Sequence, residues 1–155
     1  HLLRSSAIGT EVIDETEHQI QGGVSDLLID PDRGIVIALF IARPFAHGPL
    51  VLQTQDILSW GQRVHIRSPE VLGELQEIVR LEPFLEETRT LVSQRIHTKS
   101  GVTIGTCCDV QFNTKTFAIE WIFPRKFFWR GAALPASDIL EVTEEAIIVK
   151  DQGPR

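Results

Sequence analysis

An internal repeat constrains this chain more than any other feature of its sequence. When the sequence is aligned with itself so that Ile37 lies on Ile119, seven of 25 consecutive positions are identical; they include Asp56-Ile57-Leu58 with Asp138-Ile139-Leu140. Upstream, the alignment continues with Gly22 on Gly105 and Asp26 on Asp109, which requires one extra residue in a turn of the first copy. A repeat of this length marks a structural unit that recurs in the fold. We therefore expect two related units within the 155 residues.

Both copies have the pattern of short β-strands. Runs rich in Val, Ile and Phe alternate with turn sequences, such as residues 30–34 in the first copy and 113–116 in the second. Many short strands with close turns are typical of a small barrel or sandwich, and Gly22 and Gly105 suit a bend or bulge in a curling strand. We expect a mainly β fold with two small antiparallel β-barrels, at residues 2–67 and 91–151.

The linker between the copies, residues 68–90, has the pattern of an amphipathic α-helix. Ser68 can cap free backbone N–H groups, Pro69 suits the first helical position, and Glu70 lies near the positive end of the helix dipole. The apolar stripe that follows is Val71, Leu72, Leu75, Ile78 and Val79. The helix is expected to end before Pro83, since proline removes a backbone donor.

Composition and charge narrow the class of protein. Hydrophobic residues make up 43% of the chain, and the longest apolar run, residues 35–42, is too short to cross a bilayer. No secretory signal is visible at the N-terminus, and the two cysteines, Cys107 and Cys108, are neighbours that rarely form a disulfide. These features predict a reduced, cytoplasmic setting. The net charge of −6 opposes binding to nucleic acid, but residues 1–67 carry −3, residues 68–90 carry −4 and residues 91–155 carry +1.

Residues 22–39 resemble the signature of the PRC-barrel, a small β-barrel named after the photosynthetic reaction centre. Residues 104–109, 117–123 and 137–140 resemble a second copy, so the resemblance covers nearly the whole chain outside the linker. The resemblance implies a fold used for docking: such barrels lie on the cytoplasmic face of a membrane complex or accompany another barrel in a ribosome-maturation factor. The chain is most similar to bacterial stand-alone proteins with tandem copies, and the resemblance implies no enzymatic activity.

Sequence signatures of catalysis are absent. The chain has no glycine-rich phosphate loop, no G-x-S-x-G nucleophile elbow and no H-E-x-x-H helix. His18, His47, His65 and His97 are scattered, with no two at i, i+4 spacing, and two thiols are too few for a typical zinc site. We expect a protein that is not an enzyme and that holds no cofactor or metal.

One segment, residues 123–131, is unusual because cations and aromatics stand where a hairpin loop ordinarily carries Gly, Asn or Asp. Exposed aromatics with arginine are typical of interface hot spots, and the same mixture can stack on single-stranded bases. The alternative is that Phe127, Phe128 and Trp129 fold inward to fill the barrel or pack on the other copy. The candidate interaction residues are Arg125, Lys126, Phe127, Phe128, Trp129 and Arg130, together with Arg43 and Phe45, which repeat in the first copy.

The leading hypothesis is a non-enzymatic module that docks a protein partner of unknown identity through this loop. An RNA-associated role in ribosome assembly is the first alternative, with Trp129 stacking and Arg125, Lys126 and Arg130 contacting phosphates. A small-ligand pocket between the copies and a homodimer are further alternatives. The acidic linker either meets a basic partner or is simply solvated on its polar face.

Overall fold

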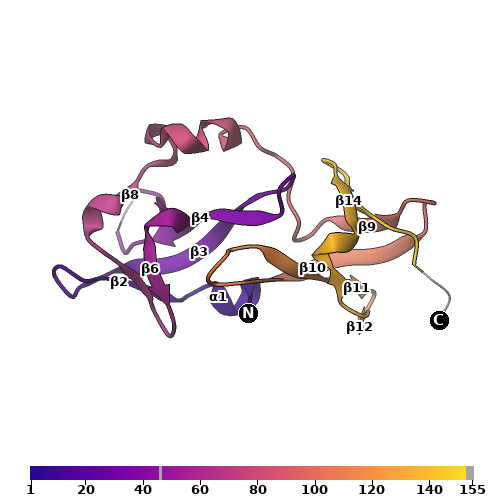
Figure 1. Ribbon diagram of the computed structural model, residues 1–155, viewed down its shortest axis with the longest axis horizontal. Coiled ribbons are helices and arrows are strands. Elements are labelled where there is room, and N and C mark those ends of the chain that lie inside the picture. The colour runs from indigo at the N-terminus through magenta and orange to yellow at the C-terminus, as the bar shows by residue number, and fades with distance from the viewer. Residues whose placement is uncertain (46, 153–155) are drawn as a thin grey trace.

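The computed structural model describes residues 1–45 and 47–152 and shows a mainly β protein with two curled sheets (Figure 1). The first sheet contains β2 (Glu11–Asp14), β3 (Ile20–Asp30), β4 (Ile35–Ala42), β5 (Leu50–Gln53), β6 (Ile57–Trp60), β7 (Val64–Ile66) and β8 (Leu72–Gly73). The second contains β1 (Leu2–Leu3), β9 (Arg95–Thr98), β10 (Thr103–Phe112), β11 (Ile119–Lys126), β12 (Trp129–Arg130), β13 (Leu134–Pro135), β14 (Ile139–Val142) and β15 (Ala146–Val149). No helix within the two described ranges is long and apolar enough to cross a membrane.

The two sheets repeat one topology. The strand order β6-β7-β2-β3-β4-β5 in the first corresponds to β14-β15-β9-β10-β11-β13 in the second. β5 pairs with the second strand of the long hairpin β3–β4, and β13 pairs with the second strand of the long hairpin β10–β11. Asp26 pairs with Phe40 as Asp109 pairs with Phe123, after a bulge at the same place. These pairings establish two curled sheets, and their closure into barrels stays a prediction.

The expectation of wholly antiparallel copies is wrong, because each sheet contains one parallel pair. β2 pairs in parallel with β7, and β9 pairs in parallel with β15. The last strand of each copy, β7 or β15, is the second strand of an antiparallel hairpin with β6 or β14. Its other edge pairs with the first strand of the copy's sheet, β2 or β9, and runs in the same direction. The hydrophobic alternation of a single strand does not reveal the direction of its neighbour, so the sequence offered no signal for this pairing.

The repeat has a different register from the one that sequence identity suggests. The offset that aligns Asp26 with Asp109 holds throughout the hairpins β3–β4 and β10–β11, so Ile119 is equivalent to Val36 and not to Ile37. The two hairpin turns are equally long, since the Gly34 amide donates to the Asp30 carbonyl at 2.8 Å and the Phe117 amide to the Asn113 carbonyl at 2.7 Å. The length difference between the copies therefore lies in the loop after β4 and β11.

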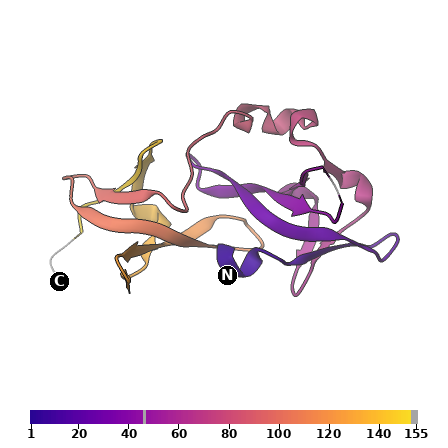
Figure 2. The ribbon, with the colours of Figure 1, turned by 180° about the vertical axis from the view of Figure 1, so that it is seen from behind.

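The two copies join through equivalent residues. Ile35 and Ala118, which this same offset makes equivalent, form an antiparallel bridge with each other. The Val36 amide donates to the Phe117 carbonyl at 2.8 Å, and the Ile119 amide donates to the Gly34 carbonyl at the same distance. Such reciprocal bonds define an approximate two-fold axis between the copies, which lie side by side along the long axis of the molecule (Figures 1 and 2).

A single hydrophobic core runs through both copies. Buried residues of both sheets belong to one cluster, and the Trp60 ring of the first copy lies 5.5 Å from the Phe112 ring and 6.5 Å from the Phe117 ring of the second. The N-terminus also crosses between copies, since β1 pairs with β10 and α1 (Arg4–Ala7) follows it. The Ser5 hydroxyl and amide both donate to the Asp109 carboxylate. Each small copy is thus completed by the other.

The predicted α-helix of the linker is wrong, although its start is confirmed. The Ser68 side chain accepts a hydrogen bond from the Glu70 amide at 3.3 Å, with Pro69 at the first position of the turn. The chain then forms the short strand β8 and three 3-10 segments: η2 (Pro69–Val71) before the strand, and η3 (Leu75–Glu77) and η4 (Val79–Phe84) after it. Leu72 of β8 pairs with Leu52 of β5, which satisfies backbone groups that a helix would have bonded internally.

The spacing of the buried side chains explains the 3-10 geometry. Leu75, Ile78, Leu81 and Phe84 recur every third residue, which is the period of a 3-10 helix, and they pack on the outer face of the first sheet. Val79, which the α-helical pattern assigned to the apolar stripe, is 80% exposed. The linker is therefore a cover for one sheet face.

Candidate functional site

The loop after β11 is a tight hairpin with two phenylalanines at its tip. Lys126 pairs with Trp129 and Arg125 pairs with Arg130, so Phe127 and Phe128 form a two-residue turn. Phe127 has φ +56°, in the left-handed region that Gly, Asn and Asp usually occupy in such turns. The turn accepts a bulky residue where a smaller one would be more stable.

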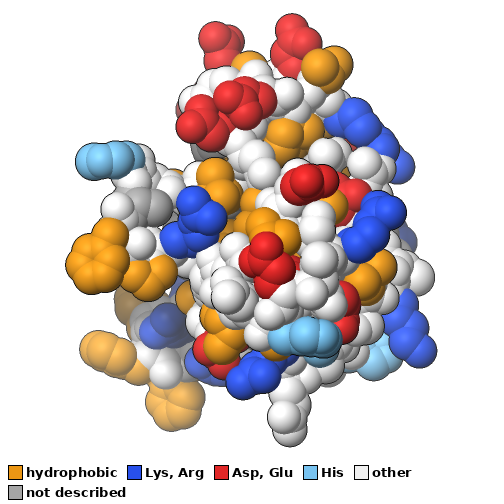
Figure 3. Space-filling model, turned by 90° about the vertical axis from the view of Figure 1, so that its left-hand side faces the viewer, with side chains coloured by type: hydrophobic (Ala, Val, Ile, Leu, Met, Phe, Trp, Pro, Cys, Tyr) orange, Lys and Arg blue, Asp and Glu red, His pale blue; other side chains and the backbone are white. Residues whose placement is uncertain are grey.

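The aromatic side chains of this loop project into solvent. Phe127 is 84% exposed, Phe128 98% and Trp129 78%. The alternative that these rings fold inward to fill the second copy is therefore wrong. Figure 3 views the molecule from the first-copy side of Figure 1, and on this view large hydrophobic side chains stand out near Lys and Arg side chains.

The three cations of the loop accompany these rings. Arg125, Lys126 and Arg130 are exposed, and within residues 1–45 and 47–152 none of them forms an ion pair. Their charges remain available to a ligand, on the copy whose net charge is +1. We call residues 125–130 the aromatic loop.

The first copy repeats part of this arrangement. Phe45 has φ +62° and is fully exposed, and Arg43 is exposed beside it. An open hollow of about 830 Å³ is lined by Gly23, Arg43 and Phe45. A smaller hollow of about 390 Å³ in the second copy is lined by Thr106, Arg125 and Phe127. The two loops belong to different sheets, so the structure forms two separate sites from the candidate residues and does not bring them together.

Glycine is required at the bend that underlies each loop. Gly22 has φ +150° and Gly105 has φ +154°. A Cβ atom would lie 2.4 Å from the Ala42 carbonyl oxygen at Gly22, and 2.6 Å from the Arg125 carbonyl oxygen at Gly105. The predicted bend at these glycines is confirmed, and it lets the strand bearing each loop approach its neighbour closely.

The geometry around the thiols does not favour nucleophilic chemistry. Cys107 is buried, and burial raises the pKa of its thiol to about 12, so the group stays protonated at neutral pH. Cys108 is partly buried and its Sγ donates to the Phe123 carbonyl at 3.2 Å. Among the described residues, no group of three or more His, Cys, Asp and Glu side chains could hold a metal ion.

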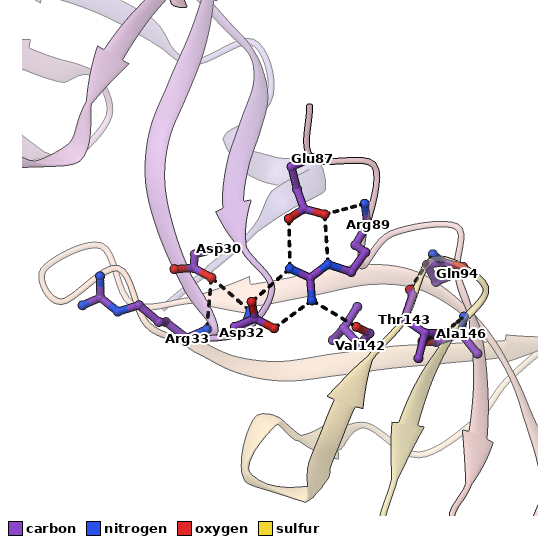
Figure 4. Close-up of polar contacts among 9 residues, drawn as sticks. All are labelled: Asp30, Asp32, Arg33, Glu87, Arg89, Gln94, Val142, Thr143 and Ala146. Atoms are coloured by element: carbon purple, nitrogen blue, oxygen red, sulfur yellow. Dashed lines mark hydrogen bonds and ion pairs between the residues drawn. The ribbon is translucent and has the colours of Figure 1, made fainter. Parts of the chain in front are cut away.

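A polar clamp at the boundary between the copies was not expected from the sequence. Arg89 donates to both oxygens of Asp32 at 2.7 and 2.9 Å and to both oxygens of Glu87 at 2.9 Å. Its remaining N–H donates to the Val142 carbonyl at 3.3 Å, so all five guanidinium donors have acceptors (Figure 4). The clamp ties the linker to the β3–β4 turn and to the second sheet. Asp32 and Val142 both lie far from Arg89 in the sequence, which leaves no local signal.

A hollow of about 430 Å³ lies between the linker and the first sheet. Leu28, Phe84 and Leu91 contribute apolar walls. The two arginines at its rim are already engaged, since Arg4 pairs with Asp26 at 3.0 Å and Arg89 is saturated by the clamp. The hollow offers apolar surface without a free charge to orient a ligand, so it does not favour the small-ligand alternative.

Neither a comparison with protein-family models nor a search of the curated proteins gives a match to this chain.

Proposed function

We propose that this chain is a non-enzymatic docking module, built on two PRC-type copies, that binds a protein partner through the aromatic loop of the second copy. The observation that supports the proposal most is the run of three exposed aromatic side chains on a tight turn, with Phe127 in the left-handed region. The two unpaired cysteines fit a reduced compartment, and we propose that the protein acts in the cytoplasm.

The energetics of the loop argue for a binding role. A bulky residue in the left-handed region costs roughly 1–2 kcal/mol of stability, and an exposed ring recovers none of it by burial. Backbone strain of this kind is typical of functional sites. Three rings that become buried only in a complex supply large contact area with few rotatable bonds, which is the composition of interface hot spots.

The charges of the loop indicate the kind of protein surface that it fits. Arg125, Lys126 and Arg130 are exposed and unpaired within the described ranges, so an acidic partner would gain their attraction without first breaking ion pairs. Opposite charges around an apolar centre raise association rates and exclude wrong partners. We therefore propose a partner with acidic side chains around an apolar pocket.

Affinity capture from the native host tests this function. The parent protein and the double variant Phe128→Ala with Trp129→Ala are immobilised in parallel, and captured proteins are identified by mass spectrometry. The expected result is a partner captured by the parent protein and lost with the double variant. Val102→Ala, which changes a 61% exposed apolar residue elsewhere on the same copy, serves as the matched control. Circular dichroism checks that each variant folds, and an unchanged set of partners with a folded double variant contradicts the proposal.

Binding to single-stranded RNA is the second candidate. The exposed Trp129 ring can stack on a base while the three cations contact phosphates, although the net charge of −6 opposes the approach of RNA. Fluorescence anisotropy with a labelled single-stranded RNA, at low and at physiological salt, separates the candidates. Affinity that falls with salt and with Trp129→Ala would favour RNA, whereas no binding at low salt rejects it.

A further inference from the structure

The outer face of the first sheet is covered by the chain itself. Ala38 and Val51 on this face are buried under Leu81, with Leu75, Ile78 and Phe84 completing the cover. The covering segment is acidic on its solvent side, where Glu74, Glu77, Glu82 and Glu86 are exposed. Figure 3 shows acidic side chains gathered at the top of the molecule, where Figure 1 places the linker.

The equivalent face of the second sheet has no such cover among the described residues. The strand register makes Trp121, Phe123 and Arg125 equivalent to Ala38, Phe40 and Ala42. Because these positions alternate along β11, their side chains share one face of the strand. Trp121 is 40% exposed, and neither it nor Phe123 belongs to either of the two hydrophobic clusters of the described chain. The face leads directly into the aromatic loop.

We propose that this outer face, along Trp121, Phe123 and Arg125, binds an acidic peptide segment of the docked partner in the place that linker residues 74–87 take on the first sheet. This inference rests on the proposed function, because it extends the docking surface of the aromatic loop along β11. The internal repeat supplies the template: the equivalent face already holds a segment with an apolar residue at every third position and acids between. The cations at Arg125, Lys126 and Arg130 attract the acids of such a segment.

The two faces differ at one position, Ala38 in the first copy and Trp121 in the second, and this difference determines the size of the partner side chain that fits there. Ala38 is small and fully buried, which leaves room for Leu81 to reach the sheet. Trp121 stands at the equivalent position, and its indole is far larger than the methyl group of Ala38. A segment docked on the second sheet therefore needs a small residue opposite Trp121, where the linker has a leucine.

Two labelled peptides with the sequence of residues 74–87, one unchanged and one carrying Leu81→Ala, test this inference by fluorescence anisotropy with the 155-residue protein. We expect the Leu81→Ala peptide to bind about tenfold more tightly, which corresponds to about 1.4 kcal/mol. Trp121→Ala in the protein recreates the geometry of the first sheet and should remove or reverse this preference. Arg125→Glu should weaken both peptides about tenfold. Lys115→Glu, on the β10–β11 turn, is the control for charge and should leave binding unchanged.

The inference is overturned if neither peptide binds. It is also overturned if Trp121→Ala and Arg125→Glu both leave binding unaltered. If Trp121→Ala does not fold, the Arg125→Glu and Lys115→Glu pair still decides the outcome. The result is separable from that for the proposed function. A partner captured through Phe128 and Trp129, with no peptide binding at Trp121, removes only the inference. Peptide binding with a partner set that the loop variant does not change removes only the proposed loop.

Discussion

Phe45 and Phe127, in the loops that follow β4 and β11, share a left-handed backbone, with φ of +62° and +56°. Both side chains are almost fully exposed, so neither contributes to the hydrophobic core. The loops that join the first two strands of each copy differ in this respect. Among their described residues, His18 of the first copy is the only non-glycine residue with a left-handed backbone, and the second copy has no counterpart. A bulky residue in the strained left-handed region of both loops supports the proposal that these rings contact another molecule.

Phe127→Gly is expected to stabilise the protein and to weaken docking. Glycine adopts the left-handed region without strain, so the free energy of unfolding should rise by about 0.5–1 kcal/mol, which raises Tm by roughly 1–4 °C. The same change removes one ring from the docking surface. Thermal unfolding and partner capture measure the two effects. Phe128→Gly, whose backbone is not left-handed, is the control, and equal changes in Tm for both variants contradict the strain argument.

The aromatic loop shows how far the sequence could predict the site. Its composition marked the segment whose rings the structure exposes, because cations and aromatics replaced the usual turn residues. It could not decide whether the rings face inward, since that depends on the two-residue turn set by the pairing of Lys126 with Trp129. The repeat likewise revealed two copies, but identities such as Ile37 with Ile119 misplaced the register by one residue along β11. Strand pairing fixes register through turn length, which sequence identity does not measure.

The linker shows the opposite failure, in which local signals were correct and the element was not. Ser68 and Pro69 start a helical turn as predicted. An α-helical stripe and a 3-10 period share Leu75 and Ile78, so the sequence alone did not separate them. The decision came from tertiary contacts, because Leu81 and Phe84 continue the three-residue period onto the first sheet and Leu72 joins the sheet edge. The Arg89 clamp has no local signature at all.

Gly22→Ala and Gly105→Ala should each destabilise the protein by about 2–4 kcal/mol, since the new Cβ meets a backbone carbonyl oxygen that cannot move freely. Gly61→Ala is the matched control, because its backbone is not left-handed and nothing lies within 4 Å of the added atom. Its expected effect is within about 0.5 kcal/mol. Urea denaturation measures all three, and a mild effect at both Gly22 and Gly105 would show that the bends are not close approaches.

Loss of the Arg89 clamp should make the protein less stable and less sensitive to acid. Its hydrogen bonds lower the pKa of Asp32 and of Glu87 below their ordinary values of 3.8 and 4.5. A lowered carboxyl pKa stabilises the folded state above the unfolded-state value and loses that contribution as the pH falls through the folded value. Arg89→Gln should therefore lower Tm at pH 7 by a few degrees and flatten the fall in Tm below about pH 4.5.

The acid profile of a second variant separates the clamp from the other carboxylates. Asp14 has a pKa lowered mainly by the Glu17 amide, with the Gln21 side chain and the Gln19 amide also contributing, and this cause does not involve Arg89. Gln21→Ala should leave the hydrogen bonds of Arg89 to Asp32 and Glu87 in place. The flattening of Tm below pH 4.5 that Arg89→Gln shows and Gln21→Ala does not is therefore assigned to Asp32 and Glu87. Parallel acid profiles for Arg89→Gln and the parent protein would mean that the clamp carries no pH-dependent stability.

The two copies should unfold as one cooperative unit and not fold separately. Trp60 of the first copy packs on Phe112 of the second, Ser5 is bonded to Asp109, and equivalent residues Ile35 and Ala118 share backbone bonds. A fragment of residues 88–152 lacks β1, α1 and Trp60, and so exposes apolar surface that the other copy buries. Urea unfolding of the full chain is expected to give coincident transitions by tryptophan fluorescence and far-UV circular dichroism. A fragment with dispersed NMR signals and its own cooperative transition would show that the shared core is dispensable.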